Sequence, residues 1–396
     1  MAVVAFVMTH TNGNCNDRMG IVKMEIKYLE LKKVTAMYAD EIHEAVSEVI
    51  DGGWYLQGAS NRQFEQQYAA YCHAKYCVGC ANGLDALTLT LRSFIELGVM
   101  KPGDEVIVPA NTYIATILAI TENGLRAVLI EPRLSTFQID DSLIECAITS
   151  RTRCIMLVNL YGKSAYTPKI GEMCEKYNLK LVIDNAQGHG LNSSFLIPNS
   201  SSLITCHSFY PGKNLGALGD GGAITTDDKT LADTFRTIAN YGSSRKYVFD
   251  YCGRNSRLDE IQAAVLSVKL RHLDADNSRR REIALRYIKE VKNPSIAMPS
   301  EEYMDNNVFH IFPVLSEQRD SLQKYLADNG IQTVIHYPIP PHEQRCYSSS
   351  DALVIPAAGL PITEQIHRQE LSLPCNQVLT DDEVDYIIST LNDFRS

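Results

Sequence analysis

The sequence predicts an α/β fold, with a large domain built on a mostly parallel sheet and a smaller C-terminal α/β domain. Short apolar runs rich in β-branched residues alternate with segments of helical periodicity, which is typical of a parallel sheet covered by helices on both faces. The chain has 396 residues, 45% of them hydrophobic and 21% charged. That composition is typical of a globular protein, and the chain is longer than a domain with one hydrophobic core usually is. We expect domains at 24–265 and 266–396.

The large domain is predicted to begin with helices. Apolar residues recur at helical spacing over 40–50, and Gly52-Gly53 ends this first helix. A second helix is expected over 61–74. A third segment with apolar residues at helical spacing begins at Asn82-Gly83, which places Gly83 at or near a helix N-terminus. The unpaired N–H groups of such an end favour a bound anion.

Six apolar, β-rich runs follow as the predicted strands. They lie at 105–109, 125–130, 153–159, 179–183, 203–207 and 222–226. Helical stretches separate several of them, notably 111–123 and 167–177. Parallel sheets bind ligands at the carboxyl ends of their strands, and Asp184 and Ser208 fall at that edge.

After Asp250 the alternation of predicted strands and helices gives way to a long helical segment. Leu258 begins a long helix that continues into the charged stretch 279–282, whose basic triplet is expected to be a solvated helix face. Beyond about residue 290 the pattern predicts the smaller α/β domain, which ends in a helix over 381–394.

Residues 1–23 are predicted to belong to neither domain. Their apolar stretch at 2–7 is much shorter than a membrane-spanning helix and follows no basic leader, so we expect no signal peptide. A flexible extension or an over-long gene start explains them, with Met24 as the natural beginning. No later segment reaches the roughly twenty apolar residues of a membrane helix, so no membrane partner is expected.

Charge and cysteine content narrow the class of function. The formal net charge of −10 argues against a nucleic acid polymer as partner, since binding phosphates needs a basic face. Eleven cysteines are scattered along a chain that can build its own core, which favours a reducing cytoplasm. Cys77 and Cys80 have the spacing of a metal or redox pair but lack a second pair, so we expect a buried strand and no metal.

Lys213 is the candidate catalytic residue. It lies in a short glycine-rich turn, 208–222, between two predicted strands, where a fixed and partly desolvated amine can attack a cofactor aldehyde. Asp184 follows the apolar run 179–183, and a carboxylate at a strand end can keep a pyridine nitrogen protonated. Together they indicate pyridoxal 5'-phosphate (PLP) as the cofactor, with Lys213 as its Schiff-base lysine.

Four segments, at 82–87, 182–190, 208–222 and 253–264, carry a wider pattern. Together they resemble the DegT/DnrJ/EryC1/StrS family of PLP-dependent aminotransferases, which act on nucleotide-linked keto sugars. The resemblance runs from about residue 24 to the C-terminus and implies the aspartate-aminotransferase-like fold, fold type I, with a sheet of seven-stranded type. Two departures stand out. Ile183 and Asn185 flank Asp184 where glutamate and a small residue are usual, and Gly212 replaces a frequent threonine.

On the ring side of the cofactor, the resemblance implies four roles. Lys213 would bond to PLP and later shuttle protons, and Asp184 would pair with the pyridinium nitrogen. Gln187 would approach the ring oxygen, and Tyr113 would stack on the ring. A helix cap remains an alternative explanation for Asp184, and a core aromatic for Tyr113.

On the phosphate side, the resemblance implies a shared site. Backbone N–H groups of Gly83 and Leu84 would hold the phosphate together with the hydroxyl of Ser208, although a turn serine is the alternative. Asn255 would reach the phosphate from the neighbouring subunit, which makes a homodimer the expected active unit.

Two further segments resemble substrate contacts. Lys246 and Tyr247, beside Arg245, would face the diphosphate of the sugar nucleotide, unless they form a solvated loop. His336 and Tyr337, with His342 beyond them, resemble a substrate-side loop of the small domain. A structural histidine is the alternative there.

The resemblance implies transamination of a nucleotide-linked keto-deoxy sugar, with glutamate as amino donor. The segments 111–116 and 210–212 are most similar to members acting on dTDP-3-oxo-6-deoxyhexoses, whose products enter surface polysaccharides such as lipopolysaccharide, or secondary metabolites. A sugar dehydratase of the same family is an alternative, although those members carry histidine in place of Lys213. A catalytically silent regulatory or scaffold homologue is the other.

Overall fold

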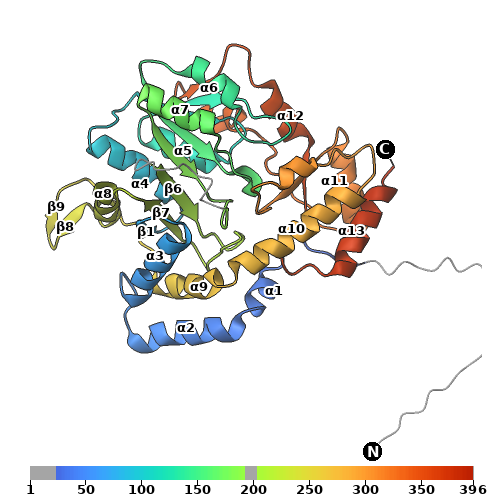
Figure 1. The fold of residues 1–396 in the computed structure, drawn as a ribbon, viewed down its shortest axis with the longest axis horizontal. Helices are drawn as coiled ribbons and strands as arrows, with labels where there is room; N and C mark the ends of the chain where they lie inside the picture. The colour runs from blue at the N-terminus through green and yellow to red at the C-terminus, as the bar shows by residue number, and fades with distance from the viewer. Residues whose placement is uncertain (1–23, 192–202, 396) are drawn as a thin grey trace, which may run out of the picture.

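The computed structural model describes residues 24–191 and 203–395, so the predicted extension at 1–23 lies outside the described residues. An eight-stranded sheet forms the centre of the molecule, in the order β1-β7-β6-β5-β4-β2-β3-β11 (Figure 1). Its strands are β1 Tyr76–Cys80, β2 Glu105–Pro109, β3 Arg126–Ile130, β4 Thr152–Val158, β5 Lys180–Asp184, β6 Leu203–Ser208, β7 Gly222–Thr226 and β11 Leu353–Val354.

The sheet is mostly parallel, as predicted. Only β7 runs antiparallel to its neighbours, β1 and β6, while the remaining pairs are parallel. The eighth strand, β11, comes from far along the chain and joins the edge beside β3, where Leu353 pairs with Ala127. The Cys77–Cys80 segment forms β1, and both thiols are buried, so the buried-strand interpretation is confirmed.

Helices cover both faces of the sheet. They are α1 Leu31–Ala36, α2 Ala39–Gly52, α3 Ala59–Tyr71, α4 Gly83–Glu96, α5 Ile114–Glu122, α6 Asp141–Ala147, α7 Pro168–Tyr177, α8 Lys229–Ala239 and α9 Glu260–Leu270, with the short 3-10 turn η1 Leu160–Gly162. Side chains alternate between the faces along each strand. In β2, Val106 and Val108 join the apolar core under α4, α5 and α8, whereas Ile107 joins the core under α6 and α7.

The C-terminal part packs around a second apolar core. Its elements are α10 Leu273–Glu290, β10 Phe312–Leu315, α11 Arg319–Asp328, α12 Pro361–Gln369, β12 Glu370–Leu373 and α13 Asp381–Asp393, with 3-10 turns η3 Glu301–Met304, η4 Pro341–Glu343 and η5 Arg345–Tyr347. Strands β10 and β12 pair antiparallel. Ile26, Phe137 and Tyr161 from the first part of the chain also enter this core. The domain boundary at 265/266 stays a prediction.

The single long helix predicted from Leu258 is two helices. Helix α9 ends at Leu270 and α10 begins at Leu273. Arg271 and His272, at the break, both contact the carboxylate of Glu41 on α2, at 2.6 and 3.1 Å. These contacts join the junction between α9 and α10 to α2.

A small hairpin projects from the large domain beyond α8 (Figure 1). It consists of β8 Ser243–Arg245 and β9 Val248–Phe249. Among the described residues, no helix combines the length and apolar character needed to cross a membrane.

Candidate active site

A cavity of about 660 Å³ opens at the carboxyl ends of the parallel strands. It brings together most of the predicted site residues: Gly83, Leu84, Tyr113, Asp184, Gln187, Ser208, Lys213, His336 and Tyr337. Residues of the C-terminal part, among them Arg280 and His310, complete the wall. Segments far apart in sequence therefore meet at the sheet edge where the sequence predicted a site.

Lys213 is carried by the tight turn that follows β6. Its backbone N–H donates to the carbonyl of Tyr210 at 2.8 Å, and a Cβ at Gly216 would lie 2.3 Å from the carbonyl oxygen of Pro211, so the turn needs glycine there. Burial lowers the pKa of Lys213 to about 8, and the negative charge of Asp184 opposes this shift. The amine is thus easier to deprotonate than an ordinary lysine.

Asp184 ends β5 and is buried. Its carboxylate accepts hydrogen bonds from the Thr116 hydroxyl at 2.8 Å and from the Ala186 N–H at 3.1 Å. Burial raises the pKa of Asp184, while these hydrogen bonds and the charge of Lys213 counteract the rise. Turns rather than a helix follow it, so the helix-cap explanation is wrong.

The first turn of α4 and Ser208 form a polar cradle on the wall of the cavity. Asn82 caps the helix by accepting from the Asp85 N–H at 2.8 Å, and its carbonyl accepts from the Ala86 N–H. Gly83 and Leu84 come before these two residues in the helix, where N–H groups have no partner within the helix, and both residues line the cavity. A Cβ on Gly83 would lie 2.5 Å from the Ser208 Cβ, so glycine allows this close approach.

Aromatic and amide groups also line the cavity. Tyr113 precedes α5 and is 51% exposed, which contradicts the core-aromatic alternative, and its ring lies 5.0 Å from that of Tyr337. Gln187 donates from Nε2 to the Tyr337 hydroxyl at 3.0 Å and accepts from the Tyr161 N–H. Both ends of its amide are therefore fixed by protein groups.

His336 is anchored from β12. Its backbone N–H donates to Glu370 at 2.6 Å, and its Nδ1 lies 2.8 Å from the Ser372 hydroxyl. Burial, followed by the charge of Lys213, lowers the pKa of His336 to about 4. The ring is therefore neutral at physiological pH.

Three residues predicted to contact the cofactor or the substrate lie away from the cavity of this chain. Lys246 and Tyr247 are on the projecting hairpin, where Lys246 Nζ lies 5.2 Å above the ring of Tyr247. Asn255 is exposed and bridges to Asn240. None of the three lines the cavity within this chain.

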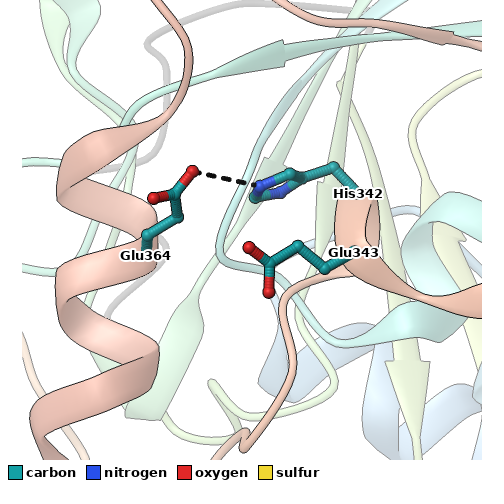
Figure 2. Close-up of side chains that lie close together, drawn as sticks. All are labelled: His342, Glu343 and Glu364. Carbon is teal, nitrogen blue, oxygen red and sulfur yellow. Dashed lines mark ion pairs between the residues drawn. The ribbon is translucent and has the colours of Figure 1, made fainter.

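His342 also lies outside the cavity wall, where it faces two carboxylates (Figure 2). Its Nε2 is 3.7 Å from Glu364 on α12, and Glu343 is adjacent. The three residue types are suited to a metal ion, but Glu343 is exposed and Glu364 also pairs with Arg368. We therefore assign no metal to this cluster.

Three functional candidates were not found by sequence reasoning. Thr116 bonds to Asp184 across 68 positions, and His310 lies 3.4 Å from the Lys213 amine across 97 positions. No spacing signal links such distant residues. Arg280 corrects an expectation: it belongs to the basic triplet predicted to be solvated, yet it is buried, donates to the carbonyls of Phe309 and Cys375, and lines the cavity.

Known proteins resemble this chain over most of its length. The model of the DegT/DnrJ/EryC1/StrS aminotransferase family matches residues 37–392. The dTDP-3-amino-3,6-dideoxy-alpha-D-galactopyranose transaminase of Aneurinibacillus thermoaerophilus is 48% identical over 384 residues, which cover 93% of this chain and 99% of that protein.

Two solved structures agree in fold. The crystal structure of S. venezuelae DesV in complex with a ketimine intermediate has a TM-score of 0.88 and 40% identity, covering 93% of this chain and 98% of that one. Bacillus subtilis NtdA with bound cofactor PMP has a TM-score of 0.84 and 30% identity, covering 95% and 86%. With a lysine-bearing cavity at the carboxyl edge of a mostly parallel sheet, the chain belongs to the DegT/DnrJ/EryC1/StrS aminotransferase family.

Proposed function

We propose that the protein transfers the amino group of glutamate to the keto carbon of a dTDP-linked 3-oxo-6-deoxyhexose, with PLP as its cofactor. The observation that carries the proposal is the placement of Lys213 and Asp184 on the wall of one cavity. A cavity of this size falls within the range of about 300–1,000 Å³ typical of small-molecule sites, and the family is one of aminotransferases.

The residues present fit PLP. Asp184 is a buried carboxylate on the cavity wall and would hold the pyridine nitrogen protonated, and the cradle of Gly83, Leu84 and Ser208 would offer N–H and O–H donors to a phosphate at a helix N-terminus. Half-exposed Tyr113 lines the cavity and would stack on the cofactor ring. When bound, PLP supplies an electron-accepting ring and an aldehyde that carries the amino group between substrates.

The chain's own residues supply the attacking amine and its proton transfers. Lys213, with a pKa lowered to about 8 by burial, loses its proton more readily than an exposed lysine and can then act as nucleophile or base. A lysine at this position favours amine transfer over the dehydratase alternative, whose members have histidine there. A silent scaffold needs neither the lysine nor its buried carboxylate partner.

The substrate assignment has separate support. The 48% identical relative is named as a transaminase of a dTDP-linked 3-amino-dideoxy sugar, and the sequence segments 111–116 and 210–212 point to the same class. Glutamate as donor follows from the family resemblance alone. For the diphosphate we propose Lys246 and Tyr247 from the projecting hairpin of a second copy, since they are exposed in this one.

A substrate panel tests the proposal. Purified protein incubated with PLP is expected to turn yellow, and glutamate should bleach that absorbance. dTDP- and UDP-linked 3-keto and 4-keto sugars are then offered with glutamate, and mass spectrometry follows the replacement of oxygen by an amino group. Lys213→Ala is the control and should neither colour nor react. No mass change with any sugar, from protein that glutamate does bleach, would remove the sugar assignment.

A further inference from the structure

We propose that His310 positions the Lys213 amine by accepting a hydrogen bond from it. Asn214 and Asn277 select the ring tautomer of His310 that makes this possible. The inference rests on the proposed function for one point, that Lys213 is the reactive amine. His310 Nε2 and Lys213 Nζ are 3.4 Å apart, and both residues line the cavity. The question is which of the two nitrogens donates.

The amide of Asn214 has one allowed orientation. Asn277 donates from Nδ2 to the carbonyl of His189 at 2.8 Å, which leaves its Oδ1 as an acceptor. Asn214 donates from Nδ2 to that oxygen at 2.7 Å and to the carbonyl of Val308 at 3.0 Å. Turning the Asn214 amide over would place its oxygen against two other acceptors, so the partners decide the assignment.

This orientation determines the tautomer of His310. Asn214 Oδ1 can only accept, and it lies 3.0 Å from His310 Nδ1, so Nδ1 carries the hydrogen. A neutral imidazole protonated at Nδ1 has its lone pair on Nε2, the atom that faces Lys213. In this form the histidine accepts and the lysine donates.

The surroundings keep His310 neutral. Burial, followed by the positive charge of Lys213, holds the pKa of His310 well below its ordinary value, and Arg280, His336 and His189 act in the same direction. The carboxylate of Asp184 acts instead on Lys213, whose pKa it raises. A doubly protonated ring, which would repel the ammonium, is therefore disfavoured.

The consequence concerns the lone pair of the lysine amine. A neutral amine attacks an aldehyde through its lone pair. The other tautomer, with hydrogen on Nε2, would donate to the amine and occupy that lone pair. In the tautomer set by Asn214, Nε2 accepts a hydrogen bond from an N–H of Lys213 instead. The lone pair of the amine then stays free to attack an aldehyde in the cavity. His310 is thus a positioning residue, and Asn214, the next residue after Lys213, carries the same turn.

The tautomer can be measured without any cofactor. In protein labelled with ¹⁵N-histidine, ring nitrogen shifts separate the two tautomers, and His310→Gln assigns the signal. We expect hydrogen on Nδ1 at neutral pH, and a shift of population toward Nε2–H in Asn214→Leu. Thr116→Val is the control, because it removes a hydrogen bond to Asp184 and leaves the contacts of Asn214 and His310 in place. A wild-type ring protonated on Nε2, or on both nitrogens, overturns the inference.

A second experiment measures the effect on Lys213. In apoprotein, the rate of bond formation with PLP is followed against pH by stopped-flow absorbance. His310→Phe removes the acceptor, and the loss of one hydrogen bond should slow the reaction about three- to tenfold on the high-pH plateau, where the amine is already neutral. It should also lower the pKa of Lys213, because the ammonium loses a partner. His310→Gln, whose amide oxygen can still accept, should stay near wild type.

The outcomes separate this inference from the proposed function. A raised Lys213 pKa in His310→Phe would mean that His310 had been a cation, and an unchanged rate and pKa would mean that it does not act on the amine; either result overturns the positioning role. If wild-type apoprotein forms no bond with PLP, the proposed function fails, while the tautomer measurement still decides the inference. Circular dichroism and thermal unfolding confirm that each variant is folded.

Discussion

Lys213 and Asp184 each change how the other titrates. Burial penalises both charges, lowering the pKa of Lys213 to about 8 and raising the pKa of Asp184. Each charge partly offsets the penalty on the other, and hydrogen bonds from Ala186 and Thr116 further favour the carboxylate. The pair is therefore coupled, so a change at one residue is expected to shift the pH behaviour of the other.

The first prediction at this scale concerns pH. Addition of PLP to apoprotein should rise with pH and level off above a midpoint near pH 8, since burial lowers the pKa of Lys213 to about 8 from an ordinary 10.5. Because the unfolded chain then binds more protons between these two values, the stability of apoprotein contributed by Lys213 should rise across that window. Asp184→Asn should move the midpoint lower, and an upward move would contradict the coupling.

The second prediction concerns the carboxylate itself. Asp184→Asn should slow single-turnover bleaching by glutamate about 10- to 150-fold, the loss expected for a hydrogen bond to a charged group. Thr116→Val removes one donor to Asp184 and should have a smaller effect, whereas Thr116→Ser keeps the hydroxyl and serves as control. Equal rates for Asp184→Asn and wild type would show that this carboxylate does not support the chemistry.

At the scale of elements, close approaches between secondary-structure ends build the site. The first turn of α4 meets the end of β6 at Gly83 and Ser208, and α3 is joined to α9 through Glu260. Glu260 accepts from the N–H groups of Gly58, Ser60 and Asn61, at 2.7, 2.9 and 3.1 Å. One buried carboxylate thus caps the start of α3 from another helix.

The third prediction tests the cradle. Gly83→Ala places a Cβ 2.5 Å from that of Ser208, so α4 and β6 must move apart and the donors lose their geometry. Affinity for PLP should fall about tenfold or more, in line with the loss of one charge-assisted hydrogen bond, as measured by equilibrium dialysis. Gly52→Ala is the matched control, since nothing lies within 4 Å of its added Cβ. Equal affinities in the two variants would contradict this use of Gly83.

The fourth prediction tests the α3 cap. Burial alone would raise the pKa of Glu260, but hydrogen bonds from Asn61, Gly58 and Ser60 outweigh it and lower the pKa. Its stabilisation is therefore present above the unfolded pKa and lost as pH falls through the lower, folded value. Glu260→Gln should reduce the free energy of unfolding by about 1.5–3 kcal/mol and flatten its pH dependence, measured by urea unfolding. Glu48→Gln, at an exposed position, is the control and should change neither the free energy of unfolding nor its pH dependence.

At the scale of the whole molecule, local patterns were predictable and distant contacts were not. The runs at 105–109 and 222–226 became strands at the predicted bounds because β-branched apolar residues fit a buried sheet. Asp184 and Lys213 were identifiable because each lies in a local motif, Asp184 at the end of a strand and Lys213 in the turn after one. Arg280 was misjudged because its helix is mostly polar, and only tertiary packing buries that one guanidinium. The role of His310 could not be predicted, because only the tertiary fold brings it close to Lys213, and no local sequence pattern encodes that contact.

The last prediction concerns the assembly that completes the site. Asn255 and the hairpin bearing Lys246 lie outside their own chain's cavity, so we expect a homodimer in which each copy completes the other's site. Asn255→Asp would set a negative charge against the cofactor phosphate and abolish activity at limiting PLP, and Lys213→Ala is inactive in any case. Unfolding and refolding the two variants together should restore about a quarter of wild-type activity, because half of the dimers are mixed and each holds one intact site. Sedimentation should show dimers throughout, and a mixture as inactive as its parents would contradict a shared site.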